Sequence, residues 1–139
     1  MANTTPARIF NGLMRHLHAL SLTPALPIAD PNIDFDPPAD GRYLRATFVP
    51  NTTDRLFIQS TGLHRYTGLF MVDVFDKPGT GETRARDVAG QVAEHFPCDD
   101  RITEEGVTLR IITRPNVGPA IIEDQAIHVP VTVEFWAFA

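Results

Sequence analysis

The fold is decided by residues 66–96, which read YTGLFMVDVF, then DKPGTGE, then TRARDVAGQVAEHF. The first segment predicts a strand, because its side chains alternate between two faces. One face carries Phe70, Val72 and Val74, and the other carries Leu69, Met71 and Phe75. Since both faces are apolar, we expect a central strand that is covered on each side.

The second and third segments predict a turn and a helix. Pro78, Gly79 and Gly81 end the strand and permit a sharp turn. Apolar residues then recur at steps of three and four, as on one face of a helix. They are Ala85, Val88, Ala89, Val92 and Phe96. We expect Thr80 or Thr83 to cap this helix.

The rest of the chain adds one helix and three strands. A helix is predicted over residues 6–20, with Thr5 as its N-cap, and residues 21–42 form a proline-rich acidic connector. Alternating apolar residues predict strands over 43–49, 107–113 and 126–139. Pro130 suggests that the last strand lies at an edge or contains a bulge. The order predicts a single α+β domain over 1–139: a mainly antiparallel sheet with two main helices on one face.

These segments, in this order, resemble the phage tail-terminator-like family. The resemblance rests on Tyr66–Val74, on Pro78–Gly81 and on the alanine-rich helix that closes on Phe96. The N-terminal helix, the strand opened by Tyr43-Leu44-Arg45 and the final strand with Val129–Phe135 extend it over nearly the whole chain.

The resemblance implies a structural virion protein. Such proteins form a ring, commonly a hexamer, on the head-proximal end of the tail tube. They stop tube polymerisation and provide the head-joining surface. The implied partners are further copies of the chain, the tail tube protein and a head-completion or connector protein, with DNA only passing through the lumen. The implied location is the virion tail, after assembly from the host cytoplasm.

Composition excludes several other classes of protein. Hydrophobic residues make up 43% of the chain and charged residues 21%, which is typical of a globular domain. The net charge of −5 disfavours a general nucleic-acid binder. The single cysteine, Cys98, cannot form an internal disulfide. We expect a soluble intracellular protein, because no signal peptide and no membrane-spanning segment are recognised.

No set of residues predicts a catalytic, cofactor or metal site. The Pro78–Thr83 loop lies between strand and helix like a phosphate loop, but Glu82 stands where that loop needs lysine. The five histidines lack the spacing of a zinc site. Asp73 is either a catalytic carboxylate or, more simply, the partner of Arg45 or Arg110. We therefore expect no enzyme and no cofactor.

Four residues are candidates for a subunit or partner interface. Phe57 and Ile58 interrupt the polar segment 51–65, which either meets a neighbouring subunit or packs as a hairpin on its own sheet. Trp136 and Phe138 lie on the outer face of the last strand, either exposed as anchors or covered by a helix. Two alternative functions remain open at this point: another head–tail connector or tube component, and a small anion-binding protein that uses the Pro78–Thr83 loop.

Overall fold

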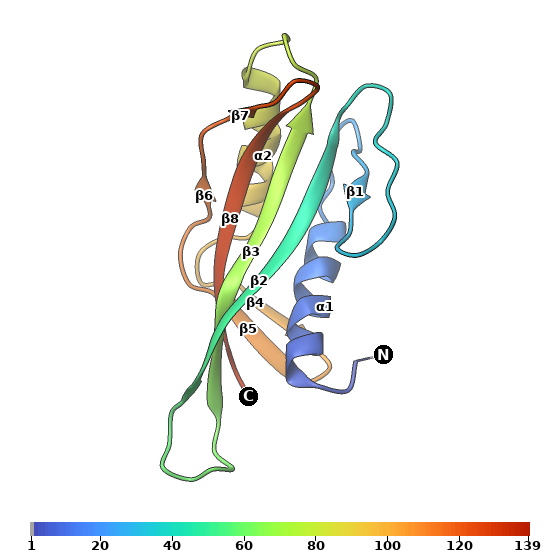
Figure 1. The fold of residues 1–139 in the computed structure, drawn as a ribbon. Coiled ribbons are helices and arrows are strands. Elements are labelled where there is room, and N and C mark those ends of the chain that lie inside the picture. Colours follow the sequence, from blue (N-terminus) through green and yellow to red (C-terminus); the bar gives the residue numbers. More distant parts are fainter. Residues whose placement is uncertain (1) are drawn as a thin grey trace.

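The computed structural model describes residues 2–139 and shows two helices beside a large curled sheet (Figure 1). The helices are α1 (Thr5–His18) and α2 (Thr83–His95). The long strands are β2 (Tyr43–Arg55), β3 (His64–Asp76) and β8 (Ile127–Phe138). The short strands are β1 (Ile28–Ala29), β4 (Arg101–Glu104), β5 (Val107–Ile111), β6 (Asn116–Val117) and β7 (Ile121–Ile122). This arrangement confirms the α+β prediction.

The sheet has the strand order β1-β2-β3-β8-β5-β4. All neighbouring pairs are antiparallel except β1 and β2, so the sheet is mixed. β3 lies between β2 and β8, which confirms the prediction of a central strand. β6 and β7 pair with the same edge of β8 as β5 does.

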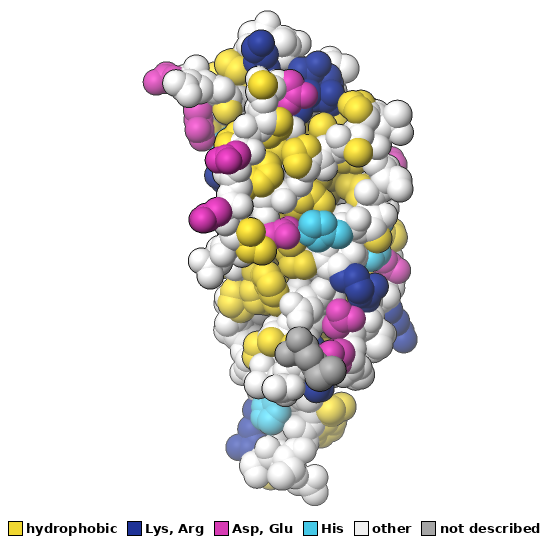
Figure 2. Space-filling view, turned by 90° about the vertical axis from the view of Figure 1, so that its right-hand side faces the viewer, with side chains coloured by type: hydrophobic (Ala, Val, Ile, Leu, Met, Phe, Trp, Pro, Cys, Tyr) yellow, Lys and Arg dark blue, Asp and Glu magenta, His cyan; other side chains and the backbone are white. Residues whose placement is uncertain are grey.

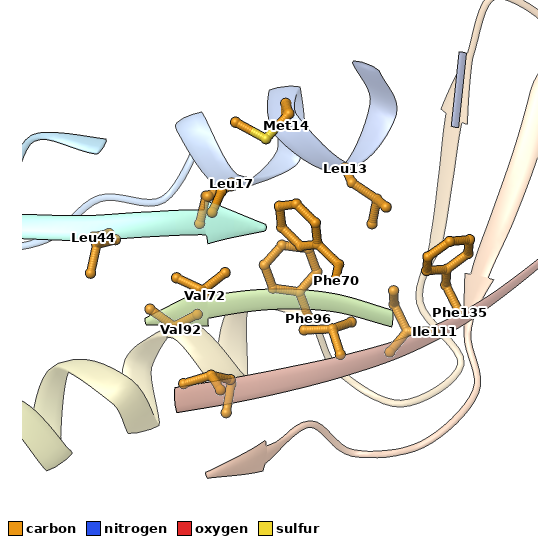
Figure 3. Packing of buried hydrophobic residues seen from close by; sticks show 14 of the residues in the cluster. Leu13, Met14, Leu17, Leu44, Phe70, Val72, Val92, Phe96, Ile111 and Phe135 are labelled. Atoms are coloured by element: carbon orange, nitrogen blue, oxygen red, sulfur yellow. The ribbon is translucent and has the colours of Figure 1, made fainter. Parts of the chain in front are cut away.

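One face of the sheet carries the hydrophobic core and both helices (Figure 3). Leu13 and Leu17 of α1 and Val92 of α2 are fully buried against Phe70 and Val72 of β3. The rings of Phe70 and Phe96 lie 5.9 Å apart and join β3 to the end of α2. The apolar stripes predicted for both helices are therefore the surfaces that fill the core.

The opposite face of β3 has no helix over it among residues 2–139, so the expectation of cover on both faces holds only toward the end of the strand, where Phe75 is buried by other side chains. Leu69 and Met71 are half-exposed there. The alternation in the sequence therefore correctly placed apolar residues on this face, but it did not reveal that part of the face is exposed. We call the face of the sheet opposite the helices the open face.

The last strand is central, not at an edge as Pro130 suggested. β3 pairs with one edge of β8 over its whole length, and β5, β6 and β7 share the other edge. Pro130 has no N–H to donate, but its carbonyl accepts a 2.8 Å hydrogen bond from the Gly118 N–H. The proline is accommodated because the partner at this level is the irregular segment around β6.

Two further expectations are corrected by local geometry. The segment between α2 and the strand predicted from residue 107 contains β4, for which no strand was predicted, and β4 forms a hairpin with β5 through Glu105 and Gly106, both at positive φ. The predicted helix caps are also wrong. Thr4 and Glu82 occupy the N-cap positions, and neither makes a side-chain capping hydrogen bond.

Candidate functional site

A long hairpin arm projects from the sheet at the junction of β2 and β3 (Figure 1). Beyond a register shift between Pro50 and Thr53, the two strands continue pairing as far as Arg55 and His64. An ion pair of 2.8 Å between Arg65 and Asp54 joins the two strands of the arm. The arm is thus an extension of the sheet with its own polar cross-links.

The tip of the arm, residues 56–63, is apolar and exposed. Ile58 is 93% exposed, Phe57 55% and Leu63 52%. A turn closed by the Gly62 N–H on the Gln59 carbonyl shapes the tip, and the Arg55 guanidinium donates to the carbonyls of residues 57 and 58. The alternative that this segment packs on its own sheet is therefore wrong for the tip.

The open face carries the other two candidate residues. Phe138 is 43% exposed and Trp136 is half-buried. The guanidinium of Arg65 lies 4.6 Å from the centre of the Trp136 ring, a cation–π contact that joins the base of the arm to β8. No helix among residues 2–139 covers these two aromatic residues, which excludes the alternative that one does.

At the other end of the open face, side chains of the same protein provide the cover. The rings of Tyr43 and Phe75 stack with their centres 4.5 Å apart, and His128 stacks on Phe75 at 4.8 Å. Arg45 lies over Phe75 and forms a 3.3 Å ion pair with buried Asp73. The expected pairing of Asp73 with an arginine is confirmed, and the arginine is Arg45.

The turn after β3 is closed by an internal ion pair rather than arranged for an external anion. The Asp76 carboxylate is buried and accepts two hydrogen bonds from Arg84, at 2.9 and 2.6 Å, and one from the Lys77 N–H. Burial raises the pKa of Asp76, but these hydrogen bonds outweigh it and hold that pKa below its ordinary value. Glu82 is exposed at the helix start, so the turn presents a carboxylate where an anion would bind.

Two histidines pack against each other between the helices. His16 and His95 stack at 4.2 Å, and each Nε2 lies 2.6 Å from the backbone carbonyl of the other residue. Residues 2–139 contain no group of three or more His, Cys, Asp or Glu side chains placed to hold a metal ion. This stacked pair joins the last turn of α1 to the last turn of α2.

One feature of the open face was missed by the sequence analysis. Arg101 and Arg110 are direct partners across β4 and β5, and Arg110 is in turn the partner of Trp136. With Phe138 and Thr108 they line a pocket of about 240 Å³. The row joins the β4–β5 hairpin to β8, which is more distant in sequence, so the strand register is needed to reveal it.

The two surfaces with exposed apolar residues, the arm tip and the open face, lie on different parts of the molecule. An interface between unlike surfaces joins copies head to tail, which closes into a ring when the rotation between copies permits. No helix in the described part of the chain is long and apolar enough to span a membrane.

Comparison with known proteins identifies the fold and the family. A solved structure is similar with a TM-score of 0.80 and 29% sequence identity, over 97% of this chain and 96% of that chain. No curated protein sequence matches significantly. The family model described as "phage tail terminator protein" matches residues 8–135. The chain therefore belongs to the phage tail terminator protein family, whose members are structural proteins of the phage tail.

Proposed function

We propose that this protein is a structural, non-catalytic component that caps the head-proximal end of a phage or phage-like tail tube. In this role it stops tube polymerisation and presents the surface to which the head is joined. The whole chain, 1–139, acts as one tail-terminator domain. The observation that carries the proposal is the family match over residues 8–135.

The functional unit is a ring of copies, as we propose, with a hexamer as the expected size. The projecting tip with Phe57 and Ile58 and the open face with Trp136 and Phe138 support a head-to-tail contact. Exposed aromatic and aliphatic residues of this kind are frequent anchors in interfaces. The ring contacts the tail tube protein on one side and a head-completion or connector protein on the other. DNA passes through the lumen.

A different connector or tube component is the nearer alternative, because it would use the same kinds of surface. Anion binding at the Pro78–Thr83 loop has less support. The buried Asp76 already engages Arg84, and Glu82 adds a carboxylate at that loop.

The test is a tube-assembly experiment with purified tail tube protein. We expect the chain to form a species of about six copies by light scattering. We also expect it to bind tube ends in electron micrographs and to shorten the tubes as its concentration rises. Incorporation along the tube wall would favour a tube component, and absence of binding to tubes would contradict the proposal.

A further inference from the structure

The pocket on the open face combines two positive charges with two aromatic rings. Arg101 and Arg110 are direct cross-strand partners, so both guanidinium groups rise from the same face beside Trp136 and Phe138. Like charges placed directly opposite each other on a sheet repel. Two positive charges are nevertheless held side by side on β4 and β5, in a chain whose net charge is −5.

The guanidinium groups of this pocket have no ion-pair partner among the described residues. The Nε of Arg110 is buried and makes no hydrogen bond to residues 2–139. Neither Arg101 nor Arg110 forms an ion pair within residues 2–139. Glu134 lies on the same face, two residues before Trp136, and it too is not ion-paired in this part of the chain. Guanidinium groups without a carboxylate partner leave charged donors at this pocket, so an oxygen acceptor from outside the chain fits the site.

The chain also carries a segment of complementary chemistry. In the connector, Ile33 is 64% exposed, and the side chains of Asp34 and Asp36 are exposed without a hydrogen bond or an ion pair to residues 2–139. Phe35 lies between these aspartates and packs on Tyr43, with ring centres 5.0 Å apart. This contact anchors the segment between the two aspartates to β2. Figure 2 shows acidic and hydrophobic side chains close together over the upper part of the face that carries β1 and the connector.

The two complementary features lie at opposite ends of the strand order. The connector flanks β1 at one edge of the sheet, whereas Arg101 and Arg110 lie on β4 and β5 at the other. A head-to-tail contact brings unlike surfaces of two copies together. Residues 121–124 form a second acidic and apolar segment. This segment lies along the same edge of β8 as β5 does, on the same side of the sheet as the arginines, so it is less suited to a head-to-tail contact with them.

We propose that the Arg101–Arg110–Trp136–Phe138 pocket receives the connector of the neighbouring copy. In this contact the carboxylates of Asp34 and Asp36 accept hydrogen bonds from the two guanidinium groups, and Ile33 packs on the aromatic rings. This proposal rests on the proposed function, in which copies of the chain form a ring, and it assigns the polar part of the contact between neighbouring copies. It favours a protein carboxylate over DNA, because two aromatic rings line the pocket beside the arginines and Glu134 lies on the same face, so the site is not a continuous basic strip.

The test is a charge swap followed by light scattering at graded concentrations, alone and in the presence of tail tubes. Arg101→Glu combined with Arg110→Glu is expected to weaken subunit association roughly a hundredfold. Adding Asp34→Arg and Asp36→Arg to the same chain is expected to restore association to within about tenfold of the unmodified protein. Circular dichroism and the melting temperature establish that each variant is folded.

Matched controls change the same charges elsewhere. Arg114→Glu alters an exposed arginine outside the pocket, and Asp124→Arg alters an exposed aspartate outside the connector. Both controls are expected to leave association within about threefold of the unmodified chain. An equal loss in Arg114→Glu would show a general charge effect and overturn the assignment.

The remaining outcomes separate this assignment from the proposed function. Rings that survive the double arginine reversal, or that are lost without rescue by the swap, overturn the assignment alone. Rings of normal mass that no longer bind tubes assign the pocket to the tube instead. Loss of binding to a labelled DNA duplex, with ring mass unchanged, assigns it to DNA. An unmodified chain that forms no ring, alone or on tubes, overturns the assignment together with the proposed ring.

Discussion

At the residue scale, Gly68 sets how closely β3 approaches its surroundings. A Cβ at this position would lie 2.8 Å from the carbonyl oxygen of Val49 and 2.9 Å from Cζ of buried Phe135. The glycine thus leaves space for the Phe135 ring next to the register shift that follows Pro50. The absence of a side chain at this position therefore allows Phe135 of the core to pack against the backbone where the arm begins.

We expect Gly68→Ala to reduce the free energy of unfolding by about 2 kcal/mol, because the methyl group overpacks a rigid site. Urea denaturation followed by circular dichroism measures this change. Gly90→Ala in α2 is the matched control, because a Cβ there meets no atom within 4 Å. That substitution is expected to stabilise the helix by roughly 0.5–1 kcal/mol. Equal effects of the two substitutions would contradict the packing argument.

His16 is the residue from which we expect a pH dependence of stability. Burial lowers the pKa of His16 below 6.5, and the charges of His95 and Arg15 act in the same direction. The hydrogen bond to the His95 carbonyl and the charge of Asp100 oppose this shift without cancelling it. The unfolded chain therefore binds a proton at a higher pH than the folded chain does.

Stability from this site is present above pH 6.5 and is lost as the pH falls from 6.5 through the lower folded pKa. We expect His16→Gln to flatten this part of the stability profile, because glutamine retains an N–H donor but does not titrate. Urea denaturation between about pH 5 and 7.5 measures the slope. His18→Gln, at a more exposed position on the same helix, is the control. An unchanged slope in His16→Gln would show that another group titrates.

At the scale of elements, the tip of the hairpin arm is expected to contribute to association between copies but not to folding. Its paired strands are continuous with β2 and β3, but the tip adds no side chain to the buried core. Apolar side chains at such a tip contribute little to folding, since they are exposed in both the folded and the unfolded chain. We expect these side chains to stabilise association instead, when a neighbouring molecule buries them.

We expect Phe57→Ser combined with Ile58→Ser to leave the free energy of unfolding within about 0.5 kcal/mol of the unmodified protein. The same variant should fail to form rings, as measured by light scattering. Ile122→Ser provides the control, since this apolar residue is 73% exposed on β7. Rings of unchanged mass in the tip variant would show that the arm is not part of the interface between copies.

At the scale of the whole molecule, charge distribution distinguishes the two proposed contacts. The chain has a net charge of −5, so identical copies repel one another in a general way, and added salt weakens this repulsion. The contact between the basic pocket and the acidic connector has the opposite response, because salt screens its attraction. Contacts of the apolar tip are nearly independent of moderate salt.

We therefore expect ring dissociation to increase as salt rises from about 0.1 M to 1 M, where the screening length shortens from about 10 Å to about 3 Å. Light scattering at fixed protein concentration measures the effect. The Arg114→Glu variant should show the same salt response, since its pocket is intact. Rings that become more stable across this range would show that apolar contacts alone hold them.

Periodic apolar patterns made much of the architecture predictable. The stripes of α1 and α2 and the alternation in β2, β5 and β8 correctly identified these elements and their buried faces, whereas in β3 the alternation identified the strand but not which of its two apolar faces is buried. Such patterns are strong because each residue of a long helix or strand repeats the same burial requirement. Strands β1, β6 and β7 have two residues each, too few to carry a pattern.

By itself, the sequence determined which elements form, which of their faces are apolar, and the family to which the central strand, turn and helix belong. Only the tertiary structure decided that β8 is central despite Pro130, that one face of the sheet is open, and that Arg101, Arg110 and Trp136 lie in one row. The physical reason is that local periodicity reports burial along one segment. Neighbours across a sheet are fixed by the register of segments that are distant in sequence.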